Sequence, residues 1–268
     1  MGEEMIRMRQ TGDFLEVESP RPVAKSKITR YLRFDDDLGS ILRELSRDSR
    51  LREVIAEVSG IRIVRQDPWE CLVSFIISRN CSIPMIRRIL DNLCDKFGKM
   101  VAWDEHVDHS FPAPGMISQA EPSELMKCGL RYGRRQALEL KKMSGFVSEG
   151  MMDFTALRRM PYEEAKSMLM SFDHGVGNKV ADCVLLFSLE KLEAFPVDVW
   201  VARAVAQLYE KYLGSELVDR IKRERRLTPK DYRCVSDFGR QRFGHYAGYA
   251  QEYLYHWIRL QQGACHLE

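Results

Sequence analysis

The sequence predicts a mostly α-helical protein with a short β segment in front. Apolar residues recur at helical spacing along most of the chain, and helix-capping residues punctuate that pattern. Alternation of apolar and polar residues is confined to one stretch, EMIRMRQTGDFLEVES, which predicts a β-hairpin with TGD as its turn. We therefore expect helix packing to build the core.

The helical segments can be placed by their apolar period and their caps. Asp67 is predicted to cap a helix that has Pro68 in its first turn. The stretch TPKDYRCVSDF at 228–238 shows the same pattern, a capping residue followed by proline. HSFPAPGMISQAEPSE is predicted to be a long connection between two helical clusters, and HVDH at 106–109 a surface loop rather than a metal site. The segments with the helical period are 39–57, 68–79, 82–97, 134–147, 161–170, 178–189, 199–212 and 244–260.

Composition restricts the class of protein. The chain has 268 residues, 45% of them hydrophobic and 30% charged, with a net charge of +2. No apolar stretch is long enough for a membrane span and the N-terminus lacks a signal-peptide core, so we expect a cytoplasmic protein, nucleoid-associated in a prokaryote. The seven cysteines, an odd number, form no C-x-x-C pair, which favours thiols in a reducing compartment. Phosphate-loop and dinucleotide motifs are absent from the sequence.

The stretch GVGNKVADC at 175–183 carries the first functional signal. It follows the predicted helix 161–170 and opens the helix 178–189, so two helices are joined by a short glycine hairpin. Gly175 and Gly177 permit a positive φ and the close approach of another backbone, and the first amides of the second helix suit a phosphate oxygen. This pattern fits a helix–hairpin–helix DNA clamp, although a tight αα-corner would look the same.

Lys179 and Asp198 are the candidate catalytic residues. An ammonium beside the positive end of a helix, at the mouth of an apolar core, should be displaced toward the nucleophilic amine. Asp198, in FPVDVW, is predicted to cap the helix that follows and to stay ionised, where it could stabilise positive charge on a sugar. Taken singly, Lys179 could be only a phosphate contact and Asp198 only a cap.

Several longer motifs carry a family resemblance. RQDPWECLVSFIISRN, PYEEAKSML, GVGNKVADCVLL, FPVDVW and YAGYAQEYLY, found in this order between Tyr31 and Trp257, together resemble the 8-oxoguanine DNA glycosylases of the helix–hairpin–helix superfamily. The resemblance implies that Lys179 attacks the anomeric carbon of a flipped nucleotide with assistance from Asp198. Base excision, a Schiff base to the opened sugar and β-elimination of the 3′ phosphate would follow.

The same resemblance implies a fold and a partner. It implies two helical subdomains that flank a cleft with a helix–hairpin–helix motif, behind the last strands of a β domain. The expected division is a β-hairpin at 1–30, one subdomain from 31–66 and 199–264, and another at 67–198. The partner would be double-stranded DNA containing an oxidised guanine, bound by a monomer without a required cofactor.

The implied base pocket contains Gln251, Tyr255 and Cys183. Gln251 and Tyr255 lie one helical turn apart, so an amide that pairs with the Watson–Crick edge and a ring that stacks would share a face. Cys183, one turn after Lys179, would form the other wall. From the residue types alone, all three would be interpreted as core residues rather than as pocket residues.

Further residues are implied to contact DNA or a cation. Asn80 would contact the orphaned base and Tyr132 would wedge into the stack, although Asn80 could also cap the next helix and Tyr132 could be a surface aromatic residue. The remaining DNA-binding residues are Gly175, Gly177, Val180, Arg131 and Arg134. The carbonyls of Ser171, Asp173 and Val176 match positions that hold a structural cation, monovalent or calcium-like.

Departures from the family pattern carry their own predictions. Met85 and Gly133 stand where eukaryotic-type enzymes place two arginines on the orphaned cytosine, which predicts weak opposite-base discrimination. His174 replaces the rigid hairpin proline, and Trp200 replaces a phosphate-binding histidine. The alternatives are a monofunctional glycosylase for alkylated or mismatched bases, which would generally lack Lys179, and a non-catalytic DNA-binding module.

Overall fold

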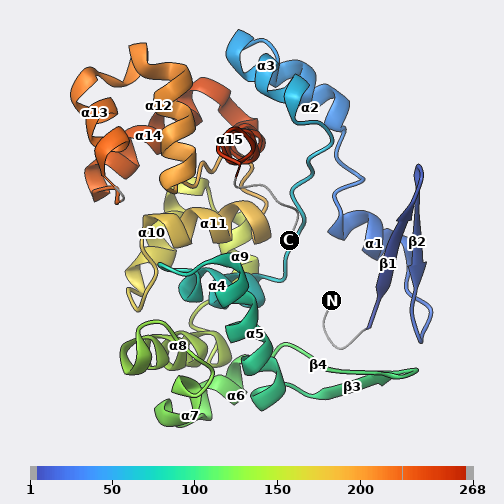
Figure 1. The fold of residues 1–268 in the computed structure, drawn as a ribbon. Coiled ribbons are helices and arrows are strands. Elements are labelled where there is room, and N and C mark those ends of the chain that lie inside the picture. Colours follow the sequence, from blue (N-terminus) through green and yellow to red (C-terminus); the bar gives the residue numbers. More distant parts are fainter. Residues whose placement is uncertain (1–4, 225, 264–268) are drawn as a thin grey trace. The chain divides into compact units, whose positions relative to one another are not determined.

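The computed structural model describes residues 5–224 and 226–263, and it confirms the mostly helical fold. About 62% of the chain is helical and 7% is in strands. The helices and the two short pairs of strands can be followed in Figure 1. Within the described ranges, no helix combines the length and the apolar character needed to cross a membrane. Cys265 and the C-terminal LE lie outside the described residues.

The chain forms two compact units that interleave in sequence. Unit 1 comprises 1–29, 66–154 and 172–175, and unit 2 comprises 30–65, 155–171 and 176–268. The expected subdomains instead grouped all of 67–198. The difference arises because residues 176–198 pack on the C-terminal helices: Tyr232 bonds to Asp182, and Ser236 Oγ donates to the Phe195 carbonyl at 3.0 Å.

Unit 1 contains two β-hairpins and a helical cluster. The predicted first hairpin is confirmed as β1 (Arg7–Thr11) and β2 (Phe14–Glu18), an antiparallel pair with Thr11 opposite Phe14. The cluster contains α4 (Pro68–Ile77), α5 (Ile83–Phe97), α6 (Pro114–Gln119), α7 (Pro122–Met126) and α8 (Gly133–Ser148). Helix α8 packs against α4, α6 and α7, and α5 packs against α4.

Two predictions in unit 1 are wrong. HVDH is not a loop but strand β4 (His106–His109), paired with β3 (Met100–Trp103). The stretch that was expected to be a long connection contains α6 and α7. Each of these short helices has a proline at its first position. Proline is favoured there because its ring fixes φ at a helical value, and because it has no backbone N–H, which at this position would have no acceptor within the helix.

Unit 2 is an all-helical assembly in which α15 (Ala247–Gln261) packs against α3, α12 and α14 (Figure 1). Its other helices are α2 (Leu38–Leu45), α3 (Ser49–Glu57), α10 (Tyr162–Ser171), α11 (Asn178–Ser188), α12 (Val199–Leu213), α13 (Ser215–Arg223) and α14 (Pro229–Phe243). Helices α1 (Lys25–Tyr31) and α9 (Phe154–Arg159) lie at the unit boundaries, and the short turn η1 (Gly244–Tyr246) precedes α15.

The helix predicted at 39–57 is two helices, because Asp48 interrupts it. The Asp48 carboxylate caps α3 by accepting from the Leu51 amide at 2.9 Å, and it also accepts from the Tyr209 hydroxyl at 2.8 Å. Side-chain bonding of this kind favours a cap over a helix interior. The predicted N-caps at Asp67 and at Thr228 are confirmed.

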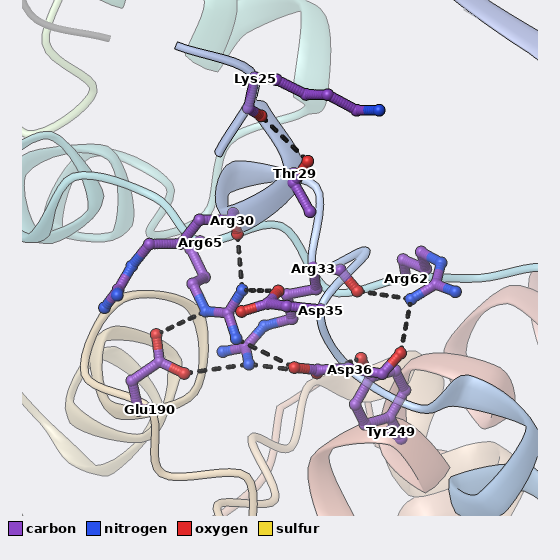
Figure 2. Close-up of polar contacts among 10 residues, drawn as sticks. All are labelled: Lys25, Thr29, Arg30, Arg33, Asp35, Asp36, Arg62, Arg65, Glu190 and Tyr249. Carbon is purple, nitrogen blue, oxygen red and sulfur yellow. Dashed lines mark hydrogen bonds and ion pairs between the residues drawn. The ribbon is translucent and has the colours of Figure 1, made fainter. Parts of the chain in front are cut away.

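A buried ionic cluster ties the start of unit 2 to the ends of α11 and α15 (Figure 2). Arg33, with 1% of its side chain exposed, lies 3.0 Å from Glu190 and 3.3 Å from Asp36. Arg65 also pairs with Glu190, at 2.8 Å, and the Tyr249 hydroxyl donates to Asp36 at 2.9 Å. Glu190 follows α11 and Tyr249 lies in α15, so the cluster fixes the ends of two helices that carry candidate site residues.

Candidate active site

Helix α11 presents Lys179 and Cys183 one turn apart. Lys179 lies in the first turn and is exposed, whereas Cys183 is 3% exposed and the helix from Val180 to Leu186 is buried. The side chain of Lys179 is open to an incoming ligand. The displacement of its ammonium toward the amine by the start of the helix stays a prediction. The side chain of Val180 is buried, which leaves only its backbone for the predicted DNA contact.

The two hairpin glycines play different roles. Gly175 has a φ of 90°, and a Cβ there would lie 3.1 Å from Glu139 Oε2 and 3.2 Å from Arg79 Nη2. Gly177 has an extended backbone with a φ of −97°, and a Cβ there would have no neighbour within 4 Å. Only Gly175 thus requires glycine for its conformation, whereas Gly177 does not adopt the positive φ that glycine permits.

His174, which stands at the position of the hairpin proline, packs against an aromatic ring in unit 1. The His174 ring stacks on Phe146 at 5.8 Å with an interplanar angle of 20°, and Phe172 lies 5.0 Å from the same ring. Asp173 adopts a left-handed φ of 59°. The cation that Ser171, Asp173 and Val176 are expected to hold by their carbonyls stays a prediction. Among residues 5–224 and 226–263 there is no cluster of three or more histidine, cysteine or acidic side chains that could hold a metal.

Asp198 is fixed as the cap of α12, as the sequence predicts. Its Oδ1 accepts from the Trp200 amide at 2.9 Å and from the Val201 amide at 2.8 Å. Both bonds satisfy donors that a helix start would otherwise leave unpaired, and they hold the carboxylate in one orientation. The Trp200 ring, at the position of the family's histidine, lies 5.5 Å from the Arg203 guanidinium carbon.

A buried carboxylate that the sequence analysis missed lies under the lysine helix. Asp182 is fully buried and accepts from the hydroxyls of Tyr162 at 2.5 Å and Tyr232 at 2.6 Å. The Lys166 ammonium donates to it at 2.8 Å. Burial raises the pKa of Asp182, and the charge and bond of Lys166 act in the opposite direction. The polar character of position 182 inside an apolar run was the signal available in the sequence.

The Asp182 cluster connects the two candidate catalytic segments. Tyr232 is 6% exposed, and its hydroxyl accepts from the Val197 amide at 3.4 Å while it donates to Asp182. Asp182 lies one turn after Lys179, and Val197 immediately precedes Asp198. One tyrosine hydroxyl therefore joins the helix that carries the lysine to the turn that carries the carboxylate.

Helix α15 presents a polar face beside Asp198. Gln251 is 5% exposed, and its Oε1 is buried without a hydrogen-bond partner among the described residues. The half-buried Tyr255 accepts from Arg259 Nη1 through its hydroxyl, at 2.8 Å. Burial raises the pKa of Tyr255, and the charges of Asp198 and Glu252 raise it further. Asp198, Gln251 and Tyr255 are therefore brought together in unit 2.

Glu252, which was not predicted, adds a second carboxyl to this group. Burial, followed by repulsion from Asp198, raises the pKa of Glu252 to about 7. The polar side chain of Gln251 acts in the opposite direction. A group with perturbed ionisation beside a capping aspartate is typical of a functional site.

The predicted orphan-base residues lie in unit 1. Asn80 is exposed with a left-handed φ of 58°, and Ser82 rather than Asn80 is the cap residue of α5. Tyr132 is 42% exposed at the start of α8, and its ring centre lies 5.7 Å from the guanidinium carbon of Arg79. Arg131 and Arg134 beside it are exposed. The turn around Tyr132 therefore combines an exposed ring with flanking cations.

The two positions expected to lack orphan-base donors also lie in unit 1. Met85 in α5 is 37% exposed, and Gly133 at the start of α8 has a φ of 50°. A Cβ at Gly133 would lie 4.0 Å from the Met126 methyl group. Both positions are therefore apolar and neither offers a side-chain hydrogen-bond donor.

Family models cover most of the chain. Residues 3–72 match the model described as 8-oxoguanine DNA glycosylase, N-terminal domain. Residues 73–224 match the model described as HhH-GPD superfamily base excision DNA repair protein. The second match alone spans more than half of the sequence.

Individual relatives are similar over most of this chain. A probable N-glycosylase/DNA lyase of Methanothermobacter thermautotrophicus is 29% identical, covering 91% of this chain and 77% of its own length. The N-glycosylase/DNA lyase of Saccharomyces cerevisiae is 31% identical, and the match covers 86% of this chain and 65% of the yeast protein. Among solved structures, the crystal structure of Clostridium acetobutylicum 8-oxoguanine glycosylase/lyase with double-stranded DNA superposes with a TM-score of 0.82 at 30% sequence identity. The match covers 96% of this chain and 82% of the Clostridium chain.

The unequal roles of the hairpin glycines can be tested by stability. Gly175→Ala should lower the free energy of unfolding by about 1–2 kcal/mol. Alanine is strained at a left-handed φ, and its Cβ would crowd the side chains of Glu139 and Arg79. Gly177→Ala is the matched control and should leave stability nearly unchanged. Chemical denaturation measures both, and equal destabilisation of the two variants would contradict this description of the hairpin.

Proposed function

We propose that this chain, which belongs to the HhH-GPD superfamily of base excision DNA repair proteins, is a bifunctional glycosylase that removes 8-oxoguanine from DNA and cleaves the abasic strand. The observation that carries the proposal is Lys179. It is an exposed amine on the first turn of α11, and the helix is joined through Asp182 and Tyr232 to the turn of the capping carboxylate Asp198.

The relatives support the substrate class. Those from M. thermautotrophicus and S. cerevisiae carry the name N-glycosylase/DNA lyase, and the C. acetobutylicum structure contains DNA with cytosine opposite 8-oxoguanine. Double-stranded DNA with an oxidised guanine is therefore the partner that we propose for this chain. That the enzyme acts as a monomer in the cytoplasm, and needs no cofactor, stays a prediction of the sequence.

In the proposed reaction the Lys179 amine is the nucleophile. Its Nζ lone pair forms a bond to the anomeric carbon, and the bond from that carbon to the base breaks, with the electron pair leaving on the base. Opening of the sugar ring yields a Schiff base between the lysine and the former anomeric carbon. Loss of a proton from the neighbouring carbon then expels the 3′ phosphate by β-elimination.

Asp198 would act electrostatically on the first step. Breaking the glycosidic bond develops positive charge on the sugar, and a fixed carboxylate stabilises that charge without having to reorganise. The two amide bonds to Oδ1 supply this fixation. Because the cap bonds belong to the folded helix, the carboxylate is oriented before DNA binds.

The base pocket would be built by Gln251, Tyr255 and Cys183. A flipped base needs a polar group for its Watson–Crick edge and flat or apolar walls for its faces. The buried, unpartnered Oε1 of Gln251 is an acceptor that such an edge would satisfy, since leaving a buried acceptor unpaired is costly. Tyr255 and the buried thiol of Cys183 would supply the walls.

On the orphan-base side, we propose weak discrimination. Asn80 and Tyr132 would meet the orphaned base and the gap in the stack, while Met85 and Gly133 provide no bidentate donor for cytosine. The exposed Arg131 and Arg134 would contact phosphates and so add affinity without sequence information.

Borohydride trapping tests the nucleophile. The wild-type protein should form a covalent adduct with a duplex containing 8-oxoguanine, and Lys179→Gln should abolish both the adduct and strand cleavage because the amide cannot form a Schiff base. Lys211→Gln, which removes an exposed lysine elsewhere in unit 2, is the control. An adduct that persists in Lys179→Gln would refute the assignment, and base release without any adduct in the wild type would favour a monofunctional enzyme.

The preference for the base opposite the lesion tests the proposed effect of Met85 and Gly133. Single-turnover rates of base removal opposite C, A, G and T should lie within about tenfold of one another, since no bidentate donor faces the orphaned base. Met85→Arg should raise the rate opposite C relative to A, whereas Met116→Arg adds the same charge to another exposed position of unit 1 and should not. A strong preference for C in the wild type would contradict this assignment.

A further inference from the structure

Arg79 lies where three segments expected to contact DNA meet within unit 1. It immediately precedes Asn80, whose φ is left-handed at 58°. Its guanidinium carbon lies 5.7 Å from the ring centre of Tyr132. A Cβ at Gly175 would lie 3.3 Å from the same carbon, so the guanidinium also packs against the hairpin backbone. One side chain therefore adjoins all three segments.

The guanidinium of Arg79 is fixed by two partners. Its Nε donates to the Ile76 carbonyl at 2.9 Å, and its Nη2 forms an ion pair with the Glu139 carboxylate. The side chain of Glu139 is 10% exposed and that of Arg79 is 26% exposed, so salt screens this pair less than a surface pair. Ile76 belongs to α4 and Glu139 to α8, so two packed helices hold the planar group in one orientation.

The backbone of Tyr132 is tied to the same point. Its amide donates to Gln136 Oε1 at 3.3 Å, and Gln136 Nε2 donates to the Ile76 carbonyl at 2.9 Å. Gln136 is fully buried. The Ile76 carbonyl thus accepts both from Arg79 and from the glutamine that holds the tyrosine backbone. The exposed ring of Tyr132 projects from this fixed turn, with the guanidinium of Arg79 over it.

We infer that Arg79 is a positioning residue for Tyr132, which holds the exposed ring in the orientation in which it enters the base stack. The inference rests on the proposed function, in which Tyr132 meets the gap left by the flipped base. Extruding a base breaks its pairing and stacking, and an inserted side chain offsets part of that cost. A ring that is already restrained by a cation over its face loses less conformational freedom on insertion.

A second arginine on the same carboxylate separates the ring contact from the charge. Arg135 pairs with Glu139 at 3.1 Å, but its side chain is 79% exposed. Without Arg79, Glu139 would therefore keep a cationic partner. Arg79 is the partner that lies over Tyr132 and against Gly175. Loss of Arg79 should release the ring, whereas loss of Arg135 should remove only a surface charge.

Single-turnover release of 8-oxoguanine from two duplexes tests the inference. The lesion is paired with cytosine in one duplex and faces an abasic site in the other, where no base pair has to be broken. Arg79→Met should slow release from the paired duplex about tenfold more than from the unpaired one, because a displaced wedge assists extrusion poorly. Arg135→Met is the matched control and should leave the ratio of the two rates unchanged.

Two further variants show whether Arg79 acts through the ring. Arg79→Lys keeps a charge for Glu139 but loses the planar group, so its ratio should lie between those of the wild type and Arg79→Met. In a Tyr132→Ala background, Arg79→Met should not change the ratio further, because the ring that it positions is gone. Equal slowing on the two duplexes, or an undiminished effect in the Tyr132→Ala background, would overturn the positioning role.

Borohydride trapping on a duplex with a preformed abasic site separates this inference from the proposed function, since no base is extruded there. Arg79→Met should form the adduct at the rate of the wild type, which also shows that the variant is folded. If it does not fold, Arg79→Lys decides, and an unchanged ratio in that variant would overturn the inference. Failure of the wild type to release 8-oxoguanine from either duplex would instead overturn the proposed function.

Discussion

The arrangement of the candidate site depends on one buried interaction, the carboxylate of Asp182 with Lys166, Tyr162 and Tyr232. A buried carboxylate is expensive unless it is paired and hydrogen-bonded, and here the bonds that offset this cost come from two other helices, α10 with Tyr162 and Lys166 and α14 with Tyr232. Helices α10, α11 and α14 are therefore held in one register. Because Tyr232 also accepts from the Val197 amide, the register extends to the turn of Asp198.

Around that anchor, the charged groups divide into structural and functional ones. Arg33 and Arg65 meet Asp36 and Glu190 in a cluster that fixes the end of α11 (Figure 2). At the other end of the site, Asp198 and Glu252 are two carboxyl groups in proximity, so they cannot both ionise without cost. Such a pair gives α15 a group that titrates near neutral pH beside the residue proposed to read the base.

The sequence predicted the parts of the fold that local physics determines. The long helices, the cap at Asp198 and the hairpin between α10 and α11 follow from periodicity and capping, and all are present. The division of the helix 39–57 at Asp48 was missed, because it involves a hydrogen bond from the distant Tyr209 hydroxyl. The helices α6 and α7 were missed because each is too short to show a helical period in the sequence.

Within the site, the sequence indicated the residues that match long motifs, but it did not indicate Asp182 or Glu252. Their roles depend on partners that are far away in the chain, such as Tyr232 for Asp182 and Asp198 for Glu252. The exposure of Lys179 was likewise beyond reach, since an apolar helix sequence does not say which side of its first turn faces solvent. Tertiary contacts decide all three.

A comparison of two tyrosine variants tests the central role of Asp182 most directly. Tyr232→Phe and Tyr162→Phe each remove one hydroxyl bond from Asp182, so each should lower the free energy of unfolding by about 1–2 kcal/mol. Only Tyr232 also contacts the turn before Asp198. Single-turnover removal of 8-oxoguanine should therefore slow by about tenfold or more in Tyr232→Phe and little in Tyr162→Phe, since small displacements of reacting groups are costly. Equal rates in the two variants would contradict the claim that this bond aligns the lysine with the carboxylate.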